Sequence, residues 1–327
     1  MKLLVTGGAG FIGSCFVRYI LNKYNDYKVI NLDALTYAGN IENLDDISDN
    51  KNYTFIHGNI CDKKLVRDLV SEVDCVVNFA AESHVDRSIT TPEIFIETNV
   101  QGTLNLLQNS KEIGVDRFLQ ISTDEVYGTL GEEGYFYETT PLAPNSPYSA
   151  SKASADMLVR AYYETYKLPV LTTRCSNNYG PYQYPEKLIP FFILQLLKGE
   201  QVPVYGDGLN VRDWIYVYDH CNAIDTVLHK GRVGEVYNIG GHNEKTNLEI
   251  TQIILEAMGR DESYIKFVKD RLGHDRRYAI SNDKIQAELG WQPTVTFEEG
   301  IHRTIDWYLK NQDWIKKIEA KKEDSLK

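Results

Sequence analysis

The stretch that decides the fold is Thr6-Gly7-Gly8-Ala9-Gly10-Phe11-Ile12-Gly13. It follows a short apolar segment, Lys2–Val5, and leads into an amphipathic segment, Ile12–Tyr24. Glycines at this spacing let the chain turn tightly, and they let a pyrophosphate approach the backbone at a helix N-terminus. They are a weak signal alone, but a strand before them and a helix after them supply the required context. The sequence therefore predicts a dinucleotide-binding turn built on Gly7, Gly10 and Gly13.

An acidic residue at the end of the second apolar segment indicates which dinucleotide binds. Asp33 follows Lys28–Leu32 and lies twenty residues after Gly13. A carboxylate there accepts hydrogen bonds from the adenosine ribose and repels a 2′-phosphate, so the expected cofactor is NAD rather than NADP. Asp62 follows the third apolar segment and has two interpretations, a contact to adenine or an N-cap for the helix that starts at Lys63.

The first half of the chain alternates short apolar segments with longer amphipathic ones. This alternation predicts strands joined by helices, and hence a parallel sheet covered on both faces. Further strands are expected over Lys28–Leu32, Tyr53–Ile56, Cys75–Phe79, Arg117–Ile121 and Val170–Thr173. Further helices are expected over Lys63–Val70, Ile94–Ile113 and from near Ser149 to about Tyr166. The predicted fold class is α/β, with a doubly wound parallel-sheet Rossmann domain.

The pattern changes after Gly180, where prolines and glycines become frequent. Helices remain around Pro190–Leu197, Val217–Leu228 and Leu248–Met258. We expect residues 1–180 to form the NAD-binding domain, with a return segment near 211–240, and residues 181–327 to form mainly a smaller α+β substrate-binding domain. The densely charged tail Trp314–Lys327 is interpreted as a solvated helix end.

Composition excludes several classes of function. The net charge is −11, from 35 Lys and Arg against 46 Asp and Glu, which opposes nonspecific binding to nucleic acid. No apolar run approaches the ~20 residues that span a bilayer, and the start lacks a signal peptide, so we expect a cytoplasmic protein with no membrane partner. The five cysteines are widely spaced without a Cys-x-x-Cys pair. They are expected as small core residues, with no disulfide framework and no metal site.

Two further stretches carry chemistry. Tyr148 and Lys152 are four residues apart, so they share one face if both lie in a helix. A lysine near a tyrosine lowers the pKa of the phenol, and a phenolate can take the proton from an alcohol as hydride leaves the carbon. Asp124 and Glu125 follow Thr123 at the end of a predicted strand. Because like charges raise one pKa, one carboxyl of such a pair can act as an acid and the other as a base.

These motifs resemble the extended short-chain dehydrogenase/reductase family over nearly the whole chain. The glycine turn, Asn99, Ser122-Thr123 and Tyr148-Ser-Ala-Ser-Lys152 occur in the family's order. Within that family, four stretches are similar to nucleotide-sugar 4,6-dehydratases. These stretches are Ala81–Ser88, Ser122–Gly128, Arg174–Pro181 and Asp270–Asp275.

The resemblance implies a dehydration with dTDP-glucose as the substrate. Tyr148, supported by Lys152, takes the C4 hydroxyl proton while NAD accepts the C4 hydride. Glu125 removes the C5 proton, Asp124 protonates the departing C6 hydroxyl, and Thr123 hydrogen-bonds the C4 oxygen. Hydride then returns to C6 and a proton returns to C5, which leaves a 4-keto-6-deoxy sugar and an unchanged NAD.

The resemblance also implies the binding residues, one by one. Around the cofactor it places Gly7, Gly10, Phe11, Ile12, Gly13, Asp33, Ala34, Leu35, Thr36, Asn59, Ile60, Asp62, Ala80, Ala81, Thr98, Ser122, Tyr148, Lys152 and Asn178. Around the nucleotide sugar it places His84, Thr123, Asn177, Lys187, Leu188, Pro203, Val204, Tyr205, Arg212, Asn247, Asp270, Arg271 and His274. Arg212 is assigned to a phosphate, for which a guanidinium fork is suited. Asn59 departs from the family, which has an acidic residue before Ile60.

Several alternatives stay open on the sequence. Thymine and uracil differ by one methyl group, so UDP-glucose is an alternative substrate. The same fold also carries sugar-nucleotide epimerases and decarboxylases, although an epimerase needs no acid/base pair at C5 and C6. A non-catalytic NAD-binding protein is a further alternative. Apolar faces on Ile94–Ile113 and Ser151–Tyr166 fit either packing on the sheet or, as the family implies, pairing in a homodimer.

Overall fold

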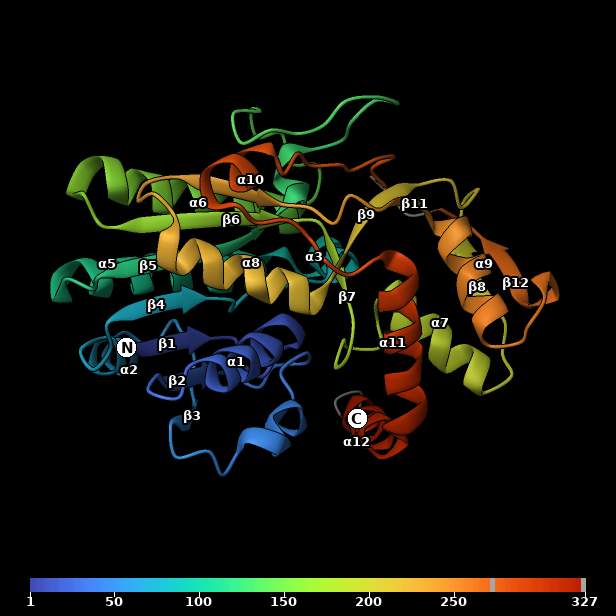
Figure 1. Cartoon of the computed structure of the whole chain (residues 1–327), viewed down its shortest axis with the longest axis horizontal. Helices are drawn as coiled ribbons and strands as arrows, with labels where there is room; N and C mark the ends of the chain where they lie inside the picture. Colours follow the sequence, from blue (N-terminus) through green and yellow to red (C-terminus); the bar gives the residue numbers. More distant parts are fainter. Residues whose placement is uncertain (271–273, 325–327) are drawn as a thin grey trace.

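The protein is described by a computed structural model over residues 1–270 and 274–324. Within this part, seven strands form one sheet in the order β10-β6-β5-β4-β1-β2-β3, and every neighbouring pair is parallel (Figure 1). The expected α/β fold class is confirmed. The strands are β1 (Lys2–Thr6), β2 (Lys28–Asp33), β3 (Tyr53–His57), β4 (Cys75–Asn78), β5 (Arg117–Thr123), β6 (Val170–Cys175) and β10 (Val236–Ile239).

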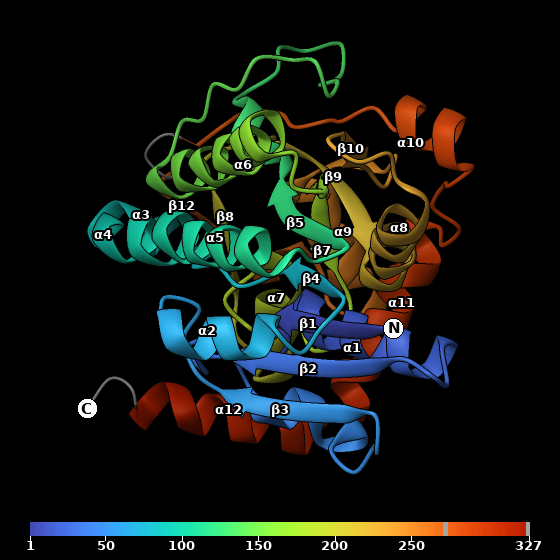
Figure 2. The same ribbon diagram turned by 90° about the vertical axis from the view of Figure 1, so that its left-hand side faces the viewer.

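Helices cover both faces of this sheet, as Figure 2 shows with the sheet seen edge-on. One face carries α1 and α8, which pack on each other, and the other carries α2, α5 and α6 in a row. Their bounds are α1 (Phe11–Lys23), α8 (Val217–Lys230), α2 (Lys63–Val70), α5 (Thr103–Ile113) and α6 (Pro147–Tyr166). A short helix, α10 (Asp283–Leu289), packs on β10.

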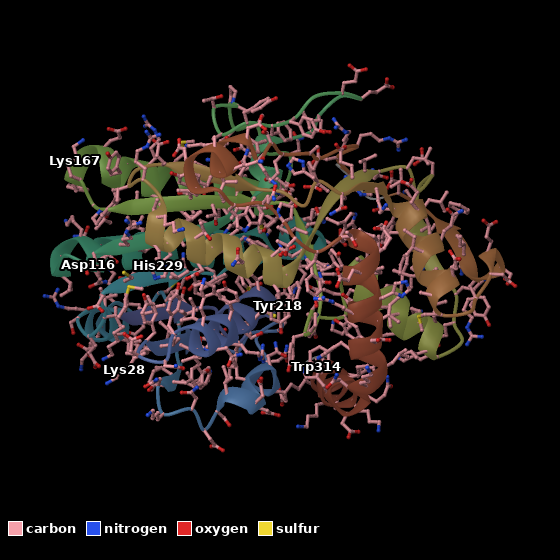
Figure 3. The ribbon with its side chains drawn as sticks, in the orientation of Figure 1. Lys28, Asp116, Lys167, Tyr218, His229 and Trp314 are labelled. Atoms are coloured by element: carbon pink, nitrogen blue, oxygen red, sulfur yellow. The ribbon has the colours of Figure 1, made fainter. Side chains whose placement is uncertain are left out.

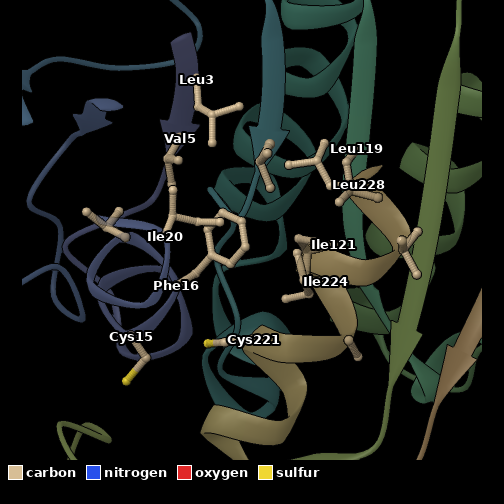
Figure 4. Close-up of a cluster of buried hydrophobic side chains, with 14 of the residues drawn as sticks. Leu3, Val5, Cys15, Phe16, Ile20, Leu119, Ile121, Cys221, Ile224 and Leu228 are labelled. Atoms are coloured by element: carbon tan, nitrogen blue, oxygen red, sulfur yellow. The ribbon is translucent and has the colours of Figure 1, made fainter. Parts of the chain in front are cut away.

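The core between the sheet and the α1–α8 pair consists of buried apolar side chains (Figure 4). Phe16 and Ile20 of α1 face Val5 of β1, and Ile224 of α8 faces Ile121 of β5. Burying a side chain of this size contributes about 1.5–3 kcal/mol. Strands buried on both faces read as continuous apolar runs, which is why they stood out in the sequence.

The strand order reverses between β1 and β4, which are neighbours although β2 and β3 intervene in sequence. The crossovers from β1 and from β4 leave toward opposite sides of the sheet, and this opens a crevice at the carboxyl ends of the strands. Ligands of doubly wound sheets bind in this crevice. The fold therefore directs the ends of β1, β2, β4, β5 and β6 to one edge.

The expected helix over Ile94–Ile113 forms with an irregular middle. It runs through α4 (Pro92–Phe95), a π-helical segment η2 (Ile96–Gly102) and α5. Gly102 lies at the end of η2, where a Cβ would come within 2.4 Å of the Ile60 side chain. A short helix, α3 (Val85–Thr90), precedes it and packs on α6.

A second region lies beside the carboxyl edge of the sheet and has its own apolar core. Its strands form a three-stranded sheet, β11-β9-β7, and a parallel pair, β12-β8. The strand bounds are β7 (Asn177–Tyr179), β8 (Val202–Tyr205), β9 (Val211–Tyr216), β11 (Glu244–Thr246) and β12 (Ile265–Val268). The helices are α7 (Leu188–Leu197), α9 (Asn247–Ala257), α11 (Phe297–Lys310) and α12 (Gln312–Asp324). Between β9 and β11 the chain returns to the large sheet through α8 and β10.

The interpretation of the tail as a solvated helix end is wrong for the first turns of α12. Trp314, Ile315 and Ile318 are buried in the core of the second region. The Trp314 indole also donates a hydrogen bond of 2.9 Å to the Asn43 side chain (Figure 3). These apolar residues recur at the three- to four-residue spacing of one helix face, but the charged residues between them made the whole segment look solvated.

The cysteines lie as expected. All five are free thiols, four of them are buried, and Cys61 is half-buried. Among the helices that the structure describes, none combines the length and the apolar character needed to cross a membrane. In the same described ranges, no group of three or more His, Cys, Asp and Glu side chains is arranged to hold a metal ion.

A charged cluster joins the end of α1 to α8 at the edge of the sheet opposite the crevice. Buried Asp225 accepts hydrogen bonds from Lys23 at 2.6 Å and from the Tyr24 hydroxyl at 3.1 Å. The Nδ1 atom of His229, a residue labelled in Figure 3, lies 3.0 Å from the Asp225 carboxylate, and its Nε2 atom lies 2.9 Å from the Tyr27 hydroxyl. The hydrogen bond to Asp225 raises the pKa of His229 above its usual value.

This cluster predicts a pH-dependent stability that depends on His229. Since the raised pKa belongs to the folded state, the stabilisation is complete below the unfolded pKa of about 6.5 and is lost as the pH rises through the folded pKa. Replacing His229 with Gln should lower stability by up to about 1 kcal/mol at pH 5.5, a partly exposed pair being screened. The difference from wild type should shrink by pH 8.5.

Urea unfolding at pH 5.5, 7 and 8.5 measures this difference. His302→Gln, at an exposed position on α11, is the matched control and should show no such trend. A His229→Gln penalty that stays constant across the pH range would rule out the protonated imidazole as its source.

Candidate active site

The glycine turn lies between β1 and α1, as the sequence predicted. Gly7 has a φ of +71°, and a Cβ on it would lie 2.6 Å from the backbone nitrogen of Ala80. A Cβ on Gly13 would lie 2.3 Å from the Gly7 carbonyl oxygen. Gly10 is the N-cap of α1 and supplies no side-chain cap. The bare backbone amides of the first turn of α1 therefore suit a pyrophosphate.

Asp33 ends β2 beside this turn and is held in place by backbone. One carboxylate oxygen accepts from the Ala9 amide and the other from the Leu35 amide, both at 2.8 Å. Burial raises the pKa of Asp33, although the two amides oppose the shift. Each oxygen keeps a second lone pair, so the carboxylate can still accept from ribose hydroxyls.

A cavity of about 310 Å³ runs from the glycine turn along the carboxyl edge of the sheet. Its lining fits an adenine dinucleotide, because glycines meet the phosphate position and Asp33 meets the ribose position. Of the residues expected around the cofactor, those that line it are Gly7, Gly10, Phe11, Ile12, Gly13, Asp33, Ala34, Thr36, Asn59, Ile60, Ala80, Ala81, Thr98, Ser122, Tyr148, Lys152 and Asn178.

Two expected cofactor residues are not brought to this cavity. Asp62 is the N-cap of α2, where its carboxylate accepts from the amides of Lys64 and Leu65 at 3.0 Å. The capping interpretation of Asp62 thus accounts for its position. Leu35 has a φ of +48° and contributes its amide to Asp33, while its side chain packs on the core.

Tyr148 and Lys152 lie in the first two turns of α6. Ser146 starts this helix with a capping box, and Pro147 follows at its first position. Both functional side chains are buried and line the cavity. The Lys152 ammonium donates a 2.7 Å hydrogen bond to the Ile121 carbonyl, which fixes it at the end of β5.

The expected lowering of the Tyr148 pKa is wrong for the polypeptide itself. Burial raises the pKa of Tyr148 well above its usual value, and the neighbouring Glu125 carboxylate raises it further. Burial also lowers the pKa of Lys152, while the Asp156 carboxylate opposes that shift. Residue spacing alone does not reveal this depth of burial.

Asp124 and Glu125 open a 3₁₀ turn, η3 (Asp124–Tyr127), directly after β5. Thr123 caps this turn, since its hydroxyl accepts from the Glu125 amide at 3.3 Å. Burial raises the pKa of Asp124 well above its usual value, and Glu125 adds to the shift. One Asp124 oxygen is buried without a hydrogen-bond partner. Asp124 is therefore suited to hold and donate a proton, as the acid/base interpretation requires.

Asn99 and Asn178 make buried side-chain hydrogen bonds next to the site. The Asn99 side chain accepts from the Glu82 amide at 2.8 Å and donates to the Glu82 carbonyl at 3.0 Å. Asn178 pairs with buried His220, whose Nδ1 lies 2.8 Å from its side-chain oxygen. Burial lowers the pKa of His220 to about 3, so the imidazole is neutral and Nδ1–H donates this bond.

A larger cavity of about 710 Å³ opens from the first toward the second region. Several residues line both cavities, so they meet there: Glu125, Asn177, Asn178, Gln183, Tyr184, Glu186 and Lys187. Of the expected substrate residues, the larger cavity is lined by His84, Asn177, Lys187, Leu188, Pro203, Val204, Tyr205, Arg212, Asn247 and His274.

Two of the expected substrate residues that the structure describes lie elsewhere. Thr123 lines the smaller cavity. Asp270 lies outside the lining and contacts His274, with 2.7 Å between its carboxylate and Nδ1. Arg271 falls outside the residues that the structure describes.

Arg212 lies on β9 with its guanidinium in the wall of the larger cavity. It donates to the carbonyl of Asp275 at 2.9 Å and to its neighbour Val211 at 2.8 Å, and it stacks 4.3 Å from the Tyr278 ring. These contacts hold the planar fork in one orientation while its other N–H groups are available to a phosphate.

Sequence reasoning missed several lining residues. Gln183, Tyr184 and Glu186 contact both cavities, and Tyr37 and Tyr278 line the larger one. Gln183 to Glu186 bridge two recognised stretches, Arg174–Pro181 and the run containing Lys187. Their position between those motifs was a usable signal. Nothing local marks Tyr37, which approaches the site only through the fold.

Comparisons with known proteins agree on one family. The model described as GDP-mannose 4,6 dehydratase matches residues 4–304. A dTDP-glucose 4,6-dehydratase of Xanthomonas campestris pv. campestris (strain B100) is 56% identical over 335 residues, covering 96% of this chain and 95% of the relative.

Two solved structures are similarly close. A dTDP-glucose 4,6-dehydratase of Bacillus anthracis str. Ames in complex with NAD has a TM-score of 0.92 and 56% identity, covering 97% of this chain and 99% of that one. DesIV, a dTDP-glucose 4,6-dehydratase of Streptomyces venezuelae with NAD bound, has a TM-score of 0.94 and 53% identity, covering 96% and 98%.

Proposed function

This chain belongs to the family described as GDP-mannose 4,6 dehydratase, and we infer that it removes water from dTDP-glucose with bound NAD. The observation that carries the reaction type is the Asp124–Glu125 pair: Asp124 lines the cofactor cavity, and Glu125 lines both cavities where they meet. Alcohol oxidation alone needs only Tyr148. A buried acid with a raised pKa beside a second carboxylate adds the means to expel a hydroxyl group.

Bound NAD, which the glycine turn and Asp33 would hold, would supply the hydride acceptor for C4 of the sugar and the hydride for C6, and so would be regenerated in each turnover. We propose that the Tyr148 oxygen receives the C4 hydroxyl proton and that Lys152 orients and stabilises it from the next turn of α6. Burial favours the neutral phenol in the polypeptide, so the charge of the Lys152 ammonium is assigned to favour the form of Tyr148 that accepts this proton.

Water loss is assigned to the turn after β5. We propose that Glu125, which reaches the junction of the cavities, removes the C5 proton once the neighbouring C4 ketone has acidified it. Asp124 gives its proton to the C6 oxygen, which leaves as water. The proton that Glu125 holds returns to C5 as hydride reaches C6. Tyr148 then releases the proton that it took from the C4 hydroxyl and Asp124 regains one, so the protein is unchanged and the sum is dTDP-glucose to dTDP-4-keto-6-deoxyglucose and water.

The larger cavity is proposed to hold the nucleotide diphosphate, with Arg212 on a phosphate and Pro203 to Tyr205 beside the base. The runner-up substrate is UDP-glucose, which lacks only the thymine methyl group, worth about 1–3 kcal/mol in a pocket. A 4-epimerase has no use for Asp124 as an acid, which makes that reaction the weaker alternative. The NAD-binding domain is proposed as residues 1–180 with a return segment near 211–240, since α8 and β10 complete its sheet, and residues 181–327 are proposed to form mainly the substrate-binding domain.

We propose that two copies associate through the row of helices α3 to α6, which lie side by side in Figure 2. Val159 and Leu107 pack on the sheet, whereas Ile89, Ile96 and Met157 are exposed at 43–49% on the outer side. A second copy that presents the same face would bury these side chains. Light scattering at micromolar concentration should give twice the 37.4 kDa chain mass, and a monomer would contradict the proposal.

A cytoplasmic location is proposed with the activity, because five free thiols suit a reducing compartment. Cell fractionation should recover the dehydratase with cytoplasmic markers. Recovery with secreted protein would exclude this location.

The first prediction is turnover of dTDP-glucose by the purified protein without added NAD. The product should be a 4-keto sugar with strong alkali-induced absorbance and a mass lower by one water. UDP-glucose in parallel is the matched control and should react about tenfold more slowly or worse, from the methyl contribution. Preference for UDP-glucose would keep the chemistry and change the base. No water loss from either sugar, even with NAD supplied, would overturn the proposed function.

Glu125→Gln separates the role of Glu125 in water loss from that of Tyr148 in oxidation. Glu125→Gln keeps the size of the side chain but cannot accept the C5 proton, so oxidation at C4 should proceed and water loss should stop. Reduced cofactor should therefore accumulate at 340 nm after substrate is mixed in, while kcat falls about 100-fold or more. Normal product formation by Glu125→Gln would remove Glu125 from the mechanism.

A further inference from the structure

A buried ion pair lies behind the active site and lines neither cavity. Arg174 on β6 donates from Nε to Asp156 on α6 at 2.9 Å, and both side chains are at least 94% buried. Removing two charges from water costs several kcal/mol per ion before their attraction is counted. A pair of this kind is a weak source of stability, so its position in the fold is the more informative property.

The pair reaches the catalytic turn through one hydroxyl group. Arg174 Nη1 donates to the Tyr127 hydroxyl at 2.9 Å, and this hydroxyl donates to the Asn238 side chain on β10 at 2.8 Å. The guanidinium also lies 4.9 Å from the centre of the Tyr127 ring. Tyr127 ends η3, the turn that Asp124 and Glu125 begin.

The other end of the pair lies on the helix of the catalytic tyrosine. Asp156 follows Lys152 by one turn of α6 and Tyr148 by two. Its carboxylate also acts against the lowering of the Lys152 pKa that burial causes. The network Tyr127–Arg174–Asp156 therefore connects the turn that carries the acid and base to the helix that carries the phenol and ammonium.

We propose that Arg174, with Tyr127 and Asp156, is a positioning unit that sets Asp124 and Glu125 relative to Tyr148 and Lys152. The proposal rests on the proposed function, because it divides that reaction between two elements. The hydrogen bonds at the start of the turn are long, with 3.3 Å from the Glu125 amide to the Thr123 hydroxyl and 3.4 Å from the Gly128 amide to the Glu125 carbonyl, and the Val126 carbonyl accepts from the Ala143 amide at 3.1 Å. The Tyr127 hydroxyl adds two shorter bonds at its far end.

This division gives a signature that a merely stabilising role would not produce. Oxidation at C4 uses residues of α6, whereas water loss uses residues of η3. If the network is loosened, η3 shifts relative to α6, and water loss slows more than the oxidation that precedes it. Substrate binding changes little, because Tyr127, Asp156 and Arg174 line neither cavity.

Tyr127→Phe tests the proposal with the smallest change. It keeps the ring that stacks on Phe136 at 5.0 Å and removes only the hydroxyl. The expected result is a kcat lowered about tenfold with KM within about twofold, since small displacements of catalytic groups carry costs of this order. The steady-state fraction of reduced cofactor at 340 nm should rise. Tyr237→Phe is the control, because its buried hydroxyl bonds Glu288 away from the site.

Hydrogen exchange provides a readout that needs no turnover. In the protein as isolated, amides of the peptide covering 124–128 should exchange at least about threefold faster in Tyr127→Phe, while those of 150–160 in α6 stay unchanged. Unchanged exchange of 124–128 together with an unchanged reduced-cofactor fraction would overturn the proposal. If wild type does not dehydrate any sugar nucleotide, the proposed function fails, and the exchange comparison still decides the positioning role.

Arg174→Lys, alone and combined with Tyr127→Phe, tests whether the two residues act together. Lysine keeps the charge opposite Asp156 but cannot hold the carboxylate and the Tyr127 hydroxyl in the same fork geometry. Each single variant should raise the reduced-cofactor fraction, and the double variant should raise it no further than the larger single effect. Additive effects would mean that the two residues act separately and would overturn the unit.

Discussion

The position of α1 against β1 depends on the close contact between Gly13 and the Gly7 carbonyl oxygen. A Cβ at position 13 would lie only 2.3 Å from that oxygen. Because α1 starts this close to β1, its first turn faces the carboxyl edge of the sheet rather than solvent. The reversal of strand order between β1 and β4 places the crevice at the same point. The start of α1, the carboxyl edge of the sheet and the crevice therefore lie together. The ends of β5 and β6 reach the same edge and bring the candidate catalytic residues beside the cofactor cavity.

Local rules predicted the features that are local. Apolar runs predicted the strands from β1 to β6. The residues of β1, β2, β4, β5 and β6 are mostly buried, as such runs indicate, whereas β3 is only partly buried. The glycine turn, Asp33 and the four-residue spacing of Tyr148 and Lys152 needed no tertiary information. The Asp124–Glu125 pair was equally visible. Its interpretation as an acid/base pair depends on its position after β5, because the order of strands in the sheet places the end of β5 beside the cofactor cavity.

Local rules could not supply burial or the partners that the fold brings from a distance. The depth of Tyr148, which reverses the expected direction of its pKa, arises from packing against residues of other elements. Arg212 is oriented by Asp275 across the second region. Trp314 is buried against Asn43, which lies far away in sequence. Asp62 fits both a cap and a ligand in sequence, and only the hydrogen bonds to its helix separate them.

The electrostatics of the site follow from the same burial. The pKa of Asp124 is raised, that of Tyr148 is raised and that of Lys152 is lowered, so each group is displaced toward its uncharged form. In such a site, charge is expensive unless it is paired. Before ligands bind, burial therefore favours the protonated form of Asp124 and the neutral phenol of Tyr148. The proposed function uses the first as an acid as it stands, whereas the second must lose its proton before it can act as a base.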